Sequence, residues 1–230
     1  YTWLPESLPI EKRMTQNSNR PAITLDALVQ ALKRPFTGSL LTSRFVFGVA
    51  FSIFQTLFSL YTLQKFGLEP TQTGYILTYV GVLSVITQGF VVGQLAKRYR
   101  EDVLLMIGVS LTAISMFLWG FVSTIPMLLL VMAPLAIAGG TLNTVLSSAL
   151  SKSVKQVEIG GILGLSVSVE SSTRVIAPIV GGWLLQSYGT SAPGIFSGVV
   201  LAGLAVYTFT HIFRHPIALE MSAPVAVSRD

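Results

Sequence analysis

The amino-acid sequence predicts an all-α membrane protein with six transmembrane helices. Hydrophobic residues make up 51% of its 230 residues and charged residues only 11%, whereas about 25% of the residues of a soluble domain are charged. Its apolar stretches are near or above the roughly 20 residues that a helix needs to cross a bilayer. Barrel strands would be alternating segments of about 10 residues. We therefore expect helices and not a barrel.

Six apolar stretches are expected to form the spans: 40–66, 73–95, 103–122, 126–150, 160–187 and 192–213. The connections between them are short, so each helix is expected to pack antiparallel against its neighbour in the sequence. Pro178, followed by Gly181 and Gly182, is expected to bend or break the fifth span beyond its midpoint. Proline removes a backbone donor and clashes with the preceding helical turn.

The basic residues alternate between the two sides of the expected spans. Of 15 Lys and Arg, most lie in alternate connections and flanks: Lys12, Arg13, Arg20, Lys33, Arg34, Arg44, Lys97, Arg98, Arg100, Lys152, Lys155, Arg214 and Arg229. By the positive-inside rule, both ends of the chain are cytoplasmic and the first span runs outward. The formal charge of +5 thus reflects topology and not nucleic-acid binding. We expect a multi-pass protein of the plasma membrane.

The segments outside the spans are polar. Residues 1–39 are expected to form a cytoplasmic loop, and residues 214–230 a cytoplasmic tail. Within the loop, 24–33 places Leu25, Leu28, Val29 and Leu32 on one helical face. This pattern predicts a short amphipathic helix on the membrane surface, although a disordered linker with chance periodicity is an open alternative. The first residues read as the exit of a preceding helix, so we expect the chain to be a fragment.

Three segments carry a resemblance to a known family: 4–8, 93–100 and 164–178. They resemble the C-terminal half of a major facilitator superfamily transporter of the drug:proton antiporter group, which includes tetracycline-efflux-type proteins. The resemblance implies the C-terminal half of a twelve-helix fold, built as two three-helix repeats, 40–122 and 126–213. It also implies a missing N-terminal half as partner. Gly93, Arg98 and Arg100 match the family's gating loop, but Lys97 stands where that loop usually has Asp, which weakens a charge-relay role.

The family resemblance implies a transport activity and no enzymatic one. We expect export of a small amphipathic or drug-like solute in exchange for protons, within a lipid bilayer. Uptake or facilitated exchange of a metabolite, and a non-transporting scaffold, remain as alternatives. No phosphate-binding glycine loop occurs in the sequence. No cofactor or metal is expected, because His211 and His215 lack the pattern of a zinc site.

Glu170 and Arg174 are opposite charges inside the fifth apolar stretch. Counted at about 1.5 Å per residue, Glu170 lies roughly 15 Å into the helix, near the bilayer midplane. Residues four apart share a helical face, so an ion pair is expected. One interpretation is proton coupling, in which separation of the pair favours proton uptake by Glu170. The other is a permanent pair that fixes helix packing.

Three further spans offer candidates for a substrate cavity. Phe51, Gln55 and Phe58 lie at helical spacing in the first span, and cavities for amphipathic solutes are mostly apolar and aromatic. The same stripe is compatible with ordinary packing or lipid contact. Asn143 and Ser147 share a face of the fourth span, and either line the cavity or bond to a neighbouring helix. Gln88 in the second span is a candidate of the same kind.

Overall fold

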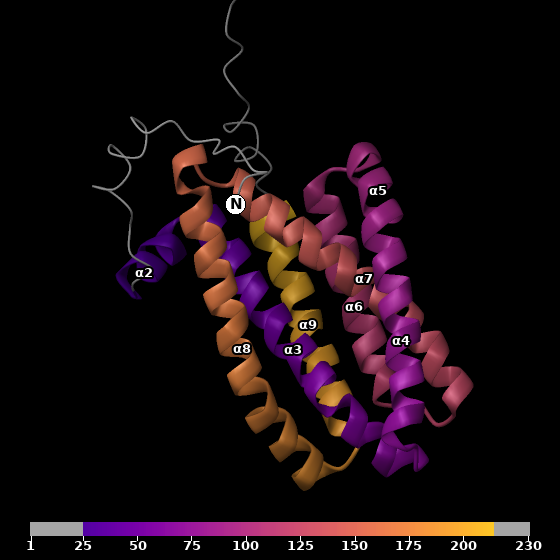
Figure 1. The fold of residues 1–230 in the computed structure, drawn as a ribbon. Helices are drawn as coiled ribbons and strands as arrows, with labels where there is room; N and C mark the ends of the chain where they lie inside the picture. The colour runs from indigo at the N-terminus through magenta and orange to yellow at the C-terminus, as the bar shows by residue number, and fades with distance from the viewer. Residues whose placement is uncertain (1–24, 214–230) are drawn as a thin grey trace, which may run out of the picture.

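The computed structural model describes residues 25–213, which are helical apart from short connections (Figure 1). Six helices are long and apolar enough to cross a membrane, which confirms the six predicted spans. The expectations for segment 4–8, for the part of the cytoplasmic loop before residue 25 and for the tail lie outside the described residues. The short helix expected over 24–33 is present as α2, Leu25–Lys33.

The spanning helices follow one another with short connections. Their bounds are α3 (Pro35–Phe66), α4 (Pro70–Ile86), α5 (Val92–Arg98), α6 (Glu101–Trp119), α7 (Ile125–Lys152), α8 (Ile159–Tyr188) and α9 (Ala192–Thr208). A π-helical turn, η1 (Thr87–Val91), joins α4 to α5, so these three elements make one span. A 3₁₀ turn, η2 (Gln156–Glu158), precedes α8, and a π turn, η3 (Phe209–Phe213), follows α9.

Local residue types account for where several helices start and stop. Pro35 and Pro70 stand in the first turns of α3 and α4, where the missing N–H has no helical partner in any case. Gly67 ends α3 with a φ of 67°, a left-handed conformation that glycine adopts without steric cost. Directly after it, Glu69 and Gln72 form a capping box at the start of α4.

Most helices do not pack mainly against their neighbours in the sequence, and that expectation is wrong. The principal pairs are α3 with α8, α3 with α9, α6 with α9, α6 with α7, and α4 with α7. In Figure 1, α3 and α9 run through the middle, with α8 on one side and α4, α6 and α7 on the other. Short loops fix only which helix ends are close. Which helix faces pack is decided by side-chain shape along the full length of the helices.

Close approach of α6 and α9 depends on glycines at their contact. A Cβ on Gly194 would lie 2.7 Å from the backbone nitrogen of Gly120, and one on Gly198 would lie 2.6 Å from the Cβ of Phe117. Membrane helices commonly use small residues in this way, because backbones in van der Waals contact stabilise helix association where lipid offers no hydrophobic driving force. The contact therefore has no room for a larger residue on α9.

α8 continues through Pro178 as one helix from Ile159 to Tyr188, so a break at that residue is ruled out. Pro178 donates no hydrogen bond to the carbonyl one turn earlier, yet packing on α3 supports the helix beyond it. Ala177 is fully buried, and a Cβ on Gly181 would lie 2.6 Å from Cδ1 of Leu57. A bend at Pro178 stays a prediction.

An ion pair joins the starts of α3 and α8. Arg34 donates through both terminal nitrogens to the two carboxylate oxygens of Glu158, at 2.9 and 3.1 Å. The bonded guanidinium holds the pKa of Glu158 below its ordinary value, and the carboxylate raises the pKa of Arg34. The two helices are thus pinned side by side at one end of the bundle.

This pair should give a pH-dependent contribution to stability. Because the folded-state pKa of Glu158 lies below its ordinary value of 4.5, the contribution is present above 4.5 and is lost as the pH falls through the lowered value. Both partners are about half exposed, so we expect Glu158→Gln to cost roughly 0.2–1 kcal/mol at pH 7. Unfolding titrations in detergent at pH 7 and at pH 3 measure this difference. A cost that persists undiminished at pH 3 would contradict the assignment.

Candidate functional site

A cavity of about 400 Å³ opens between α3, the α4–η1 span, α7 and α8. Its lining combines three charged side chains, several amides and an aromatic wall. The lining residues are Arg44, Phe47, Gly48, Phe51, Ser52, Phe54, Gln55, Leu77, Val80, Gly81, Ser84, Gln88, Gly139, Gly140, Asn143, Glu170 and Arg174. Six of the residues that the sequence singles out therefore come together around one space: Phe51, Gln55, Gln88, Asn143, Glu170 and Arg174.

The charged residues of the cavity lie at matching depths on α3 and α8. Arg44 follows the start of α3 by nine residues and Glu170 follows the start of α8 by eleven, which correspond to rises of about 14 and 16 Å. The Arg34–Glu158 bonds hold the two starting points together. Equal rise from a common end therefore brings the Arg44 guanidinium level with the Glu170 carboxylate.

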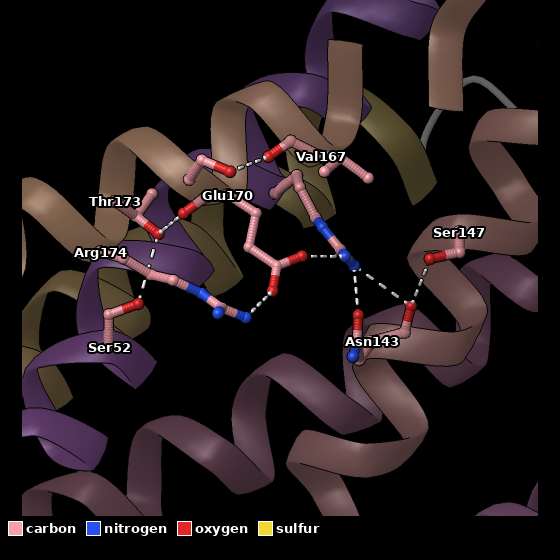
Figure 2. A network of polar contacts seen from close by, with 9 residues as sticks. Ser52, Asn143, Ser147, Val167, Glu170, Thr173 and Arg174 are labelled. Atoms are coloured by element: carbon pink, nitrogen blue, oxygen red, sulfur yellow. Dashed lines mark hydrogen bonds and ion pairs between the residues drawn. The ribbon is translucent and has the colours of Figure 1, made fainter. Parts of the chain in front are cut away.

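Glu170 is held by two arginines, one on each oxygen. Arg44 Nη2 donates to Oε2 at 2.8 Å, and Arg174 Nη2 donates to Oε1 at 2.9 Å (Figure 2). The ion pair expected between Glu170 and Arg174 is present, and Glu170 forms a second ion pair with Arg44. The two arginines differ in burial, since the Arg44 side chain is 9% exposed and that of Arg174 is 69% exposed.

Arg44 also joins a third helix to the network. Its Nη1 donates to the Asn143 side-chain oxygen and to the Asn143 carbonyl on α7. Thr173 donates to the Glu170 carbonyl at 2.7 Å and lies 3.3 Å from the Ser52 hydroxyl, which adds a second link between α8 and α3 (Figure 2). The network thus connects α3, α7 and α8 through one buried guanidinium.

The cavity carries an excess positive charge. Its lining contains two guanidinium groups and one carboxylate, hence a net +1, and no other charged residue among those that line it. Both carboxylate oxygens are already bonded to arginine. A net positive charge attracts anionic ligands and repels cationic ones.

An aromatic wall borders the charged groups. Phe47, Phe51 and Phe54 follow one another on α3, with ring centroids 5.4 and 5.9 Å apart. Glycines on α7 make room for two lining side chains: a Cβ on Gly139 would lie 2.9 Å from the Phe51 ring on α3, and one on Gly140 would lie 3.3 Å from the Gln88 amide nitrogen in η1. The cavity therefore has an aromatic side beside its charged side.

Two of the predicted cavity residues lie elsewhere. Phe58 is fully buried and packs against Phe54, 5.1 Å between ring centroids, so it belongs to the core between helices. It lies about one turn beyond Gln55, the last residue of α3 in the cavity lining, and belongs to the hydrophobic core cluster. Ser147 does not line the cavity either. Its hydroxyl donates to the Asn143 carbonyl at 2.9 Å, so it bonds within its own helix.

The residues of the expected gating loop lie between the start of α5 and the start of α6, outside the cavity lining. Arg100 pairs with the buried carboxylate of Asp102 at 3.2 Å. Gly93 has open space where a side chain would stand, and Arg98 lies in the last turn of α5. A gating role for Gly93, Arg98 and Arg100 stays a prediction.

Sequence reasoning missed Arg44, which it counted with the basic flanks. The available signal was its position inside an apolar stretch, as with Arg174. α3 begins at Pro35, so Arg44 is well within the span and not at its edge.

For metal binding, residues 25–213 contain no cluster of three or more His, Cys, Asp or Glu. His211 stacks on Tyr207, with 4.4 Å between the ring centroids.

Comparison with known proteins supports a transport family. A family model described as Major Facilitator Superfamily matches residues 40–226. Solute carrier family 22 member 18 of Mus musculus is 32% identical over 72% of the chain and 41% of its own length. Tetracycline resistance protein, class H, of Pasteurella multocida is 26% identical over 74% and 43%. Multidrug resistance protein 2 of Bacillus subtilis is 27% identical over 88% and 50%. The chain thus spans half or less of the length of these relatives.

Proposed function

The chain belongs to the major facilitator superfamily, and from this membership we propose that it is half of a secondary transporter that exports a small amphipathic solute in exchange for protons. Six apolar helices and the family make it an integral, multi-pass membrane protein. The family is one of transporters, which supports the expectation that the chain is not an enzyme. The observation that carries the proposal is the Glu170 carboxylate between two arginines in the cavity wall.

The organisation that we propose is the C-terminal half of a twelve-helix transporter, made of two three-helix repeats. If α3, α4 and α6 of the first repeat correspond to α7, α8 and α9 of the second, each contact between helices should have a counterpart. The α3–α8 contact then corresponds to the α7–α4 contact. The α3–α9 contact corresponds to the α7–α6 contact. All four pairs occur, and α6 packs on its own counterpart α9. This symmetric pairing supports the repeats. In such folds, substrate sites lie near the bilayer midplane where repeats meet.

The size and lining of the cavity support an amphipathic solute, with an apolar part and a polar part. Its volume of about 400 Å³ falls in the range of small-molecule sites, roughly 300–1,000 Å³. Phenylalanine rings and amide side chains line the same space. Two of the relatives are named for resistance to tetracycline and to multiple drugs, which supports a drug-like solute and outward transport.

Proton coupling would use Glu170 as the group that gains and loses the proton. Its bonds to Arg44 and Arg174 come from different positions, one on α3 and one on α8 itself. A movement of α8 relative to α3 would remove the Arg44 partner. A carboxylate that loses a charged partner in a low-dielectric surrounding favours its neutral form, so the movement and proton uptake would be linked.

We further propose a plasma-membrane location with both ends of this chain cytoplasmic, as the positive-inside rule indicates. In this orientation α2 lies at the cytoplasmic surface. Val29 and Leu32 on α2 are 48% and 44% exposed. Apolar side chains half exposed on a short helix beside a membrane bundle support its contact with the lipid headgroups.

Glu170→Gln in the intact transporter is expected to abolish the part of solute transport that depends on an imposed pH gradient, because glutamine cannot exchange the proton. Transport into or out of proteoliposomes, measured with and without the gradient, provides the readout. Glu158→Gln is the matched control, since Glu158 also pairs with an arginine at 2.9 Å but lies outside the cavity. Coupling through Glu170 is refuted if the variant keeps the gradient dependence of the wild type.

A further inference from the structure

We propose that the cavity selects solutes with a single negative charge, a carboxylate on a small aromatic body, and that Arg174 binds that charge. This inference rests on the proposed transport function and narrows its substrate class. It comes from the way in which the three charged side chains of the cavity share their bonds.

The carboxylate of Glu170 is a poor partner for a cationic solute. Each of its oxygens accepts a hydrogen bond from a guanidinium, at 2.8 and 2.9 Å. A cation that bound there would share oxygens that already accept from guanidiniums and would lie close to both positive groups. It would also enter a cavity in which two positive groups face one negative group, so the field of the site opposes it.

Arg44 is not available to a solute either. Its side chain is 9% exposed, and its two terminal nitrogens donate to Glu170 and to both oxygens of Asn143. Removing any of these bonds would leave a buried charge or a buried oxygen without a partner. Arg44 therefore serves as the fixed counter-charge of Glu170.

Arg174 is the arginine with free donors. Its side chain is 69% exposed and lines the cavity. Only Nη2 is engaged, by Glu170, and its other N–H groups have no partner among residues 25–213. A guanidinium presents its donors as a planar fork that matches the two oxygens of a carboxylate. The excess positive charge of the cavity is thus located on a side chain that a solute can reach.

Binding of an anion at Arg174 would leave no charge unpaired. If the guanidinium turns from Glu170 toward the solute, Glu170 keeps its bond to Arg44. The double pairing of Glu170 therefore allows one arginine to exchange partners at low cost. A cavity with one arginine for one carboxylate would lack this freedom.

The remaining lining selects the body of the solute. Phe47, Phe51 and Phe54 form a continuous aromatic wall, and aromatic rings prefer offset or edge contacts with other rings. Gln55 and Gln88 add amide groups to the same space. An aromatic carboxylate places its charge at the guanidinium and its ring against apolar carbon.

The test uses three probes with the same ring system and different charges: 2-naphthoate, 2-naphthamide and 2-naphthylmethylammonium. Binding to the intact transporter in detergent is measured by the rise in thermal unfolding temperature with ligand concentration. We expect 2-naphthoate to bind roughly tenfold or more tightly than the other two, since hydrogen bonds between charged groups contribute that much. Equal binding of all three, tightest binding of the ammonium probe, or no binding of any probe overturns the proposal.

Three variants assign the preference to a residue. Arg174→Gln is expected to remove the preference for the anion, whereas Arg174→Lys keeps the charge and retains a weaker preference because lysine lacks the fork. Arg34→Gln is the matched control, since Arg34 also pairs with a glutamate at 2.9 Å and is 52% exposed, but lies outside the cavity. Loss of the preference in Arg34→Gln, or its retention in Arg174→Gln, contradicts the assignment.

The binding test is independent of the transport test. Anion selectivity in detergent with no effect of a pH gradient in proteoliposomes would refute proton-coupled export and leave the anion site intact. Gradient-dependent export of a solute, with no preference for the anionic probe, would refute the anion site alone.

Discussion

Arg44→Ala is expected to destabilise the helix bundle by about 2–4 kcal/mol, and Arg174→Ala by about 1 kcal/mol or less. The difference follows from burial. Removing Arg44 leaves a partly buried carboxylate with one partner on its own helix, and breaks the bonds that join α3 to α7 and α8. The Arg174 side chain is 69% exposed. When it is removed, water can hydrogen-bond to the Glu170 oxygen that the guanidinium contacted.

Free energies of unfolding in mixed detergent micelles measure this difference. Arg44→Lys serves as a further comparison, because lysine retains the charge but cannot bond to Glu170 and Asn143 together; it should lie between the wild type and Arg44→Ala. Equal costs for Arg44→Ala and Arg174→Ala would show that the network is not organised around Arg44.

Gly198→Ala should weaken the contact of α6 with α9 and destabilise the fold by about 2–3 kcal/mol. The added methyl carbon would lie 2.6–2.7 Å from the Cβ, Cα and backbone nitrogen of Phe117. Backbone atoms cannot rotate away as a side-chain end can, so the two helices must separate along their contact. Loss of dispersion contacts over several turns then adds to the local strain.

Gly203→Ala provides the control on the same helix. Gly203 is exposed, and a Cβ there meets nothing within 4 Å. Alanine is a better helix former than glycine by up to about 1 kcal/mol, so this variant should be neutral or slightly stabilising. The same unfolding titration applies to both. Equal stabilities of the two variants would mean that α6 and α9 accommodate the methyl group without separating.

The sequence was sufficient for the spans because each depends on local properties. Length and apolarity identify all six helices, and Pro35 or Gly67 mark ends through their own backbone preferences. The bond between Glu170 and Arg174 was also predictable, since helical geometry alone brings residues four apart together. For the same reason Phe51 and Gln55 could be placed on one face of α3.

What could not be predicted depends on contacts between helices. Arg44 and Glu170 are 126 residues apart in the chain, and no periodicity connects them. Phe58 shares the stripe of Phe51 and Gln55, yet it is fully buried in the core between helices and packs against Phe54. The direction in which a helical face points is set by its neighbours, and the sequence of one helix does not contain that information.

The π-helical turn Thr87–Val91 changes how this span must be aligned with its relatives. A π turn bonds residue i to i+5 and so holds one residue more than an α-helical turn. Residues before and after it are therefore out of phase by about 100° around the helix axis. A relative that lacks the turn can match this span only with a one-residue gap in the middle of a membrane helix. Aligned from the start of α4 without that gap, the residue equivalent to Gly93 would be sought on the wrong side of the helix.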